Sequence, residues 1–244
     1  MKVVIFETIR RHFKNTTFLI FLVVLCGLAL LIGGYGGPLR VWQGLLSATV
    51  LLLSCQLIGP EFSSGTLQLI LAKPVRRDSY LLGRVAGVVA VVWTAALAAS
   101  IADAMGRLMS RASDVPWSEV AASEVNLGLS VVIVCALMAF FGSFTRSYLN
   151  IALYFGIQIT LSFAEAALRT LKLALNGRFA PVGLYLRNHD FLERALSAVS
   201  ANLFPGQPAA FDLPFALLIA GNAAVALYAA CVIFSRREVP YAAD

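Results

Sequence analysis

The sequence predicts an all-α integral membrane protein with six transmembrane helices. Hydrophobic residues make up 59% of the 244 residues and charged residues only 13%, whereas a typical soluble domain has about 25% charged residues. A helix needs about 20 apolar residues to cross a bilayer. Such runs occur at about 17–35, 41–59, 79–102, 125–145, 149–168 and 213–234. The short segments of alternating polarity that build outer-membrane barrels are absent, so we expect one helical transmembrane domain over residues 1–244.

The distribution of basic residues predicts the orientation of these spans. Six spans place both termini on the same side of the membrane. If that side is the inner one, the inner segments hold ten Lys and Arg in about fifty residues, against eight in about seventy outside. This bias predicts cytosolic termini. Arg84, just inside the third span, is expected to snorkel to the inner surface.

The net charge of +6 is thereby explained by membrane topology. A basic patch with interleaved aromatic residues on a soluble domain, which is typical of nucleic-acid binding, is not found. We therefore expect membrane lipid as a partner and no nucleic acid.

The amino-terminal stretch predicts a helix over residues 3–15 that lies in the membrane interface. Its apolar stripe consists of Ile5, Phe6, Ile9 and Phe13. Its polar side consists of Glu7, Arg10, Arg11 and Lys14. A basic amphipathic helix of this kind binds at the level of the lipid headgroups. The alternative is an ordinary basic flank that frays.

The insert "GPEFSSGTLQLILAKPVRR", residues 59–77, predicts a short amphipathic helix over 60–73 at the cytosolic end of the bundle. Pro60 and Glu61 suit the first turn of a helix. Pro74 ends it, and Arg76 and Arg77 hold the next segment at the inner surface. Its narrow polar stripe consists of Glu61, Ser64, Gly65 and Gln68. Two interpretations remain from these residues alone: a docking surface for another protein, or a connector with interfacial contacts.

Residues 60–87, "PEFSSGTLQLILAKPVRRDSYLLGRVAG", resemble the segment after the second span of ABC-2-type transporter permeases. Those proteins have an acidic residue, Gly-Thr-Leu, a run of leucines, Pro-Val, a basic residue and a Leu-rich span with Gly-Lys or Gly-Arg. The matching positions here begin at Glu61 and end at Arg84. Ser63 and Ser64 stand where many members have Arg or Glu. The interfacial helix, the six spans and the basic tail are similar to the family's plan.

The resemblance implies that the insert is a coupling helix, which seats in a groove of a cytosolic P-loop ATPase. The implied docking residues are Glu61, Phe62, Ser64, Gly65, Thr66, Leu67, Gln68, Pro74, Arg76 and Arg77. It further implies substrate export across a bacterial-type inner membrane, with ATP-Mg bound by the partner ATPase. A second copy of the chain, or a related permease, would complete the pathway.

The sequence offers no catalytic machinery of its own. It lacks the G-x-x-x-x-G-K-[ST] loop that holds nucleotide phosphates, and it has no G-x-S-x-G, HExxH or CxxC motif. His189 and Glu193 share a helical face, but two such groups beside one Asp fit a solvated helix better than a metal site. We therefore expect a transport subunit that is not an enzyme and has no cofactor or metal.

Polar residues within the spans are candidates for a substrate route, because ionisable groups inside a membrane are costly and often functional. Gln158 and Glu165 are assigned to such a route. The alternative for them, and for Asp103, Asn150 and Asn222, is hydrogen bonding between helices or at the interface. The spacings of Gly83 with Gly87 and of Gly33 with Gly37 suggest close helix packing.

The outer segment 169–212 is predicted to form short helices on the outer face, broken at Asn176-Gly177 and by three prolines. Two other functions remain open. One is a membrane subunit of the same type that serves the assembly or maturation of a larger complex. The other is an ATP-independent carrier or structural membrane protein.

Overall fold

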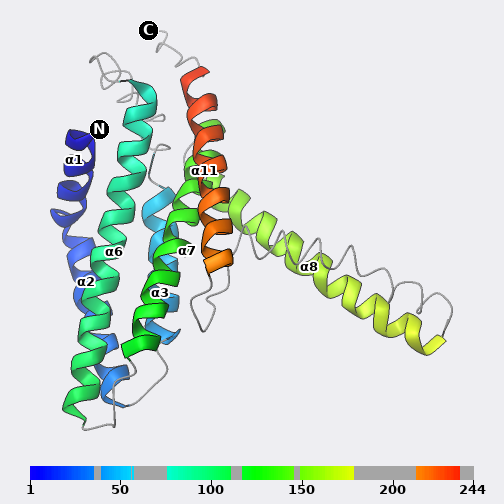
Figure 1. The fold of residues 1–244 in the computed structure, drawn as a ribbon, viewed down its shortest axis with the longest axis horizontal. Coiled ribbons are helices and arrows are strands. Elements are labelled where there is room, and N and C mark those ends of the chain that lie inside the picture. Colours follow the sequence, from blue (N-terminus) through cyan, green and yellow to red (C-terminus); the bar gives the residue numbers. More distant parts are fainter. Residues whose placement is uncertain are drawn as a thin grey trace. The chain divides into compact units, whose positions relative to one another are not determined.

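The computed structural model describes residues 1–35, 40–55, 57, 76–110, 117–145, 149–178 and 213–236. All regular structure in this part of the chain is helical (Figure 1). The helices are α1 (Lys2–Phe13), α2 (Thr16–Gly34), α3 (Arg40–Cys55), α6 (Arg77–Met109), α7 (Trp117–Phe144), α8 (Leu149–Arg178) and α11 (Leu213–Arg236). Five of them, α2, α6, α7, α8 and α11, contain stretches long and apolar enough to cross a membrane. The prediction of a helical integral membrane protein is confirmed.

Contacts divide the chain into two compact units. The first comprises Met1–Ile151 and Gln207–Asp244, and the second comprises Ala152–Gly206. The long helix α8 begins in the first unit and continues into the second. The first unit contains the other six helices and the hydrophobic core.

Helices α1 and α2 follow one another along the length of α6. Helix α6 has 33 residues, or about 50 Å, and α1 and α2 together cover it from its start to its end (Figure 1). Between them, Lys14 follows the end of α1 and Asn15 caps the start of α2, because its side chain accepts a hydrogen bond from Thr17 N at 3.0 Å. Because α1 and α2 are separate helices, α1 can turn about its own axis independently of α2 as it packs on α6.

The contacts of α1 with α6 are made at two glycines spaced one turn apart. A Cβ at Gly83 would lie 3.0 Å from the Cβ of Val4, and one at Gly87 would lie 2.6 Å from the Cβ of Thr8. The distance at Gly87 is shorter than side chains tolerate, and the distance at Gly83 is tighter than most Cβ contacts, so the two glycines allow α1 to lie this close. The close packing predicted from the Gly83 and Gly87 spacing is thus present, with α1 as the partner.

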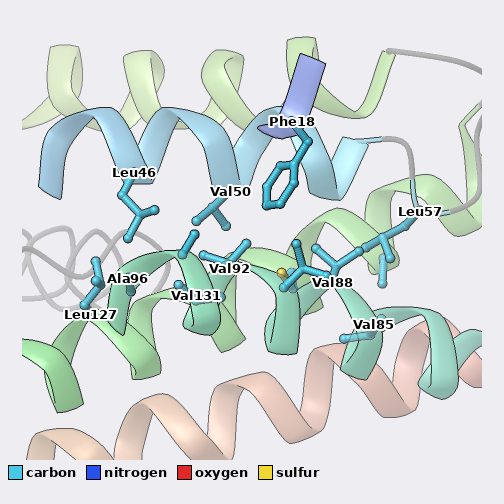
Figure 2. Close-up of a cluster of buried hydrophobic side chains, with 14 of the residues drawn as sticks. Phe18, Leu46, Val50, Leu57, Val85, Val88, Val92, Ala96, Leu127 and Val131 are labelled. Carbon is cyan, nitrogen blue, oxygen red and sulfur yellow. The ribbon is translucent and has the colours of Figure 1, made fainter. Parts of the chain in front are cut away.

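Helix α3 returns antiparallel to α6 and packs between α6 and α7. Leu46 of α3 lies opposite Ala96 of α6, and Val50, one turn later, lies opposite Val92, one turn earlier (Figure 2). All four side chains are buried. The described part of α3 has 16 residues, about 24 Å, and is not among the five candidate spans.

Helices α7 and α11 complete the bundle. Helix α11 packs mainly on α7, where it buries Ile219, Ala223, Ala230 and Phe234. The opposite side of α11 exposes Leu217, Val225 and Tyr228. In a membrane protein such a side faces lipid or another protein chain.

Three helices extend beyond the spans that hydropathy predicts. Helix α6 runs to Met109, α7 begins at Trp117, and α8 continues to Arg178. Residues 169–175, where a separate short helix was expected, instead continue α8, which ends directly after Asn176-Gly177. Hydropathy ends a span where polar residues begin, but a helix continues wherever its backbone can keep hydrogen bonding.

Candidate functional site

The end of the first unit at which the insert, residues 59–77, begins and ends gathers segments from across the chain. We call it the insert end; it is marked by Leu57 after α3 and by Arg76 and Arg77 at the start of α6. Arg77 Nη1 donates to the carbonyl of Ser235 at 3.3 Å, which joins the start of α6 to the end of α11. Met1 and the end of α11 lie at this same end (Figure 1).

The predicted docking residues Glu61, Phe62, Ser64 to Gln68 and Pro74 lie outside the described residues. The structure does place the last two members of that set. Arg76 is the exposed residue that precedes α6, and Arg77 is the first residue of the helix, half-buried against α11. The structure thus describes Leu57 before the insert and Arg76 and Arg77 at its end, but not residues 58–75.

Two side chains from other helices bind the carbonyl groups at the end of α3. Arg84 Nε of α6 donates to Leu57 O at 3.3 Å, and Asn150 Nδ2 of α8 donates to Cys55 O at 3.2 Å. Helix ends leave carbonyl groups without partners in the helix. Protein covers all four of these residues, so the side-chain donors take the place of water.

This contact corrects the expectation for Arg84. Only 8% of its surface is exposed, so it does not reach out to the membrane surface. The end of α3 offers carbonyl oxygens and the negative end of a helix dipole within its reach, and both favour a guanidinium group. For Asn150, a hydrogen bond between helices was one alternative expected from the sequence, and Asn150 does form such a bond.

Helix α1 presents three different sides at the insert end. Val4 and Thr8 face α6. Ile9 and Phe13 pack against the core, and Phe13 contacts Phe18 edge to face. Phe6 stays 67% exposed. The apolar stripe predicted for an interfacial helix is therefore shared between the core and the outside.

The exposed surface of the insert end is basic. Its exposed cations are Lys2, Arg10, Arg11, Lys14, Arg76 and Arg236. Glu7 lies 3.9 Å from Arg10, with both side chains more than half exposed, so this pair adds little stability. Burial lowers the pKa of His12, and the charges of Arg84 and Arg11 lower it further. A neutral His12 thus lies beside a cationic surface.

Gln158 and Glu165, the predicted pathway residues, lie on α8 in the second unit, seven residues apart and half-exposed. That spacing places them on one side of the helix. Neither forms a hydrogen bond or ion pair with another described residue. The structure leaves their assignment to a substrate route as a prediction.

Sequence reasoning missed a polar contact between α6 and α7. Ser100 Oγ of α6 donates to the carboxylate of Glu124 on α7. Hydropathy placed Glu124 outside its span, whereas the helix continues through it. Further along α6, Arg107 pairs with Asp103 at 2.9 Å. Among the residues that the structure describes, no group of three or more His, Cys, Asp or Glu could hold a metal ion.

Comparison with known proteins identifies the family. A search of the curated proteins found no match. A family model described as ABC-2 family transporter protein matches residues 2–239, nearly the whole chain. The match includes α1, all candidate spans and the insert. The chain therefore belongs to the ABC-2 family of transporter proteins, as a membrane-embedded permease subunit.

Proposed function

We propose that this permease forms half of an export pathway and couples ATP hydrolysis by a separate cytosolic ATPase to substrate export. The observation that supports the proposal is the composition of the insert end. Both ends of the insert, the start of α1 and the end of α11 lie there, together with the exposed cations. Basic residues concentrate on the cytosolic side of membrane proteins, which is where an ATPase is available.

In this proposal residues 60–73 of the insert form the coupling helix. The docking residues are Glu61, Phe62, Ser64 to Gln68, Pro74, Arg76 and Arg77. The chain has no P-loop of its own, so ATP-Mg binds to the partner. A second copy or a related permease supplies the other half of the pathway, and Gln158 and Glu165 line the substrate route.

The direct test is purification from native membranes in mild detergent, followed by identification of the bound proteins. We expect a P-loop ATPase with the wild type and its loss with Gly65→Trp and Glu61→Arg. Tyr35→Trp is the matched control, since Tyr35 is 89% exposed and follows α2 at the end of that helix that lies away from the insert end. Absence of an ATPase under all mild conditions would favour the carrier or structural alternative. An ATPase bound without any transport function would favour the assembly alternative.

The proposed topology has six crossings, with α3 as the second and both termini in the cytosol. Tyr35 follows α2 and Arg76 precedes α6, and both are exposed. In a variant without native cysteines, Tyr35→Cys should react with a membrane-impermeant maleimide added outside. Arg76→Cys should react only after permeabilisation. Reaction of both from outside would show that α3 does not cross and would refute this topology.

A further inference from the structure

The end of α3 is built as a joint between three helices. Cys55, Leu57 and Asn150 are at most 2% exposed and Arg84 is 8% exposed, so protein shields both hydrogen bonds from water. The two donors are far apart in sequence, at 27 and 95 residues from their acceptors. They also belong to different helices, α6 and α8. The point where the insert begins is thereby tied to two helices at once.

The side chain of Asn150 is held in position for this contact. Its Oδ1 accepts a hydrogen bond from Ile151 N at 2.9 Å, which leaves the Nδ2 group as the donor to Cys55 O. Asn150 is the second residue of α8. Helix α8 is not adjacent to the insert in the chain, and this hydrogen bond gives the end of α3 a direct contact with it.

Arg84 serves the other side of the joint. It lies two turns into α6, the helix that begins where the insert ends. Its bond to Leu57 O therefore closes a loop: both ends of the insert are fixed to the same part of α6. A force on the insert then displaces α3 and α6 together instead of unwinding the end of α3.

We propose that Arg84 and Asn150 are positioning residues that transmit movement of the insert to α6 and α8. This inference rests on the proposed function, because it takes a docked ATPase as the source of the movement. Coupling requires contacts that bias a second site when the first one moves. The hydrogen bond from Asn150 is the one whose effect is most easily isolated.

The test measures hydrogen exchange in the permease–ATPase complex in lipid nanodiscs, without nucleotide and with ATP-Mg trapped by vanadate. Asn150→Leu removes the donor at similar volume, and Asn150→Gln keeps an amide donor. Thr145→Val is the matched control: Thr145, which directly follows α7, is also buried near this end, and its hydroxyl donates to Phe141 O of α7 at 2.7 Å.

In the wild type, trapping is expected to change exchange at the starts of both α6 and α8. Asn150→Leu should assemble with the ATPase and keep the change in α6 but lose the change in α8. Asn150→Gln should restore it in part, and Thr145→Val should keep both. An assembled Asn150→Leu complex with the full α8 response would overturn the inference, as would equal loss in Thr145→Val.

The same experiment separates this inference from the function on which it rests. If no ATPase binds the wild-type permease, the proposed function fails. If the ATPase binds but its nucleotide leaves α8 unchanged in the wild type, only the transmission role of Arg84 and Asn150 fails.

Discussion

Gly106 of α6 lies directly against the backbone of Leu30 in α2. A Cβ at Gly106 would overlap the carbonyl oxygen of Leu30 and would lie 2.8 Å from the backbone nitrogen of Gly34. Reciprocally, a Cβ at Gly33 would overlap the backbone of Asp103. The two helices therefore meet backbone to backbone, which is the geometry that small residues allow in membrane proteins.

This contact predicts that Gly106→Val destabilises the bundle, because backbone atoms cannot move aside as a flexible side chain can. We expect the free energy of unfolding to fall by on the order of 1–3 kcal/mol or more, which is typical of overpacking. The loss would be measured as a lower thermal midpoint in detergent. Gly27→Val is the control, since a Cβ there meets nothing within 4 Å. Equal midpoints for the two variants would contradict the close approach of α2 and α6.

Gly87→Leu should separate α1 from α6. The added side chain would meet Thr8, whose own side chain is 2% exposed and donates to Val4 O at 2.8 Å. Once α1 is released, trypsin should cut faster after Arg10 and Arg11, which mass spectrometry of the digest would show. Gly221→Leu, on an open side of α11, should leave the cleavage rate unchanged. Unchanged cleavage in Gly87→Leu would argue against the packing described for α1.

The pair of Asp103 and Arg107 predicts an asymmetric response to mutation. The Asp103 side chain is only 2% exposed, and its Oδ1 has no hydrogen-bond partner among the described residues. Arg107→Met would leave a buried carboxylate without its counter-charge, which costs about 3–5 kcal/mol. The double variant Asp103→Leu/Arg107→Met should be more stable than Arg107→Met alone. A double variant less stable than the single one would refute this account.

His12 predicts a loss of stability on acidification. The pKa of His12 in the folded protein lies below its ordinary value of 6.5, because of burial first and then the charges of Arg84 and Arg11. As the pH falls below 6.5, the unfolded chain takes up a proton that the folded chain resists, so stability falls until the lowered pKa is passed. The thermal midpoint should drop less between about pH 7.5 and about pH 5.5 in His12→Gln than in the wild type. A larger drop in the variant would contradict the prediction that His12 makes the folded protein less stable at acidic pH.

Periodicity and composition predicted most of the fold, because the physical signals are local. Apolar runs of sufficient length predicted the helices α2, α6, α7, α8 and α11, and the amphipathic pattern after Met1 predicted α1. The positions of the helix ends were harder to predict from the sequence. Glu124 and Asp103 lie where hydropathy places the limits of spans. Each has a partner on α6, Ser100 for Glu124 and Arg107 for Asp103, and α7 and α6 continue past them.

The contacts of the candidate site were not predictable, because they join residues far apart in sequence. Arg84 looked like a cation that should reach the membrane surface, and no local pattern shows that the end of α3 lies beside it. Nor does any local pattern show that His12 of α1 lies near Arg84. The spacing of Gly83 and Gly87 did signal a close contact, but not that α1 would fill it.

The central claim is that the insert docks a cytosolic ATPase, and photocrosslinking in intact cells tests it most directly. A photoreactive amino acid would be placed at Gln68 in the insert and, as a control, at Trp117, which is 62% exposed at the start of α7, away from the insert end. We predict an adduct with a P-loop ATPase from position 68 and none from position 117. Equal expression with no ATPase adduct from position 68, or the same adduct from both positions, would contradict the claim.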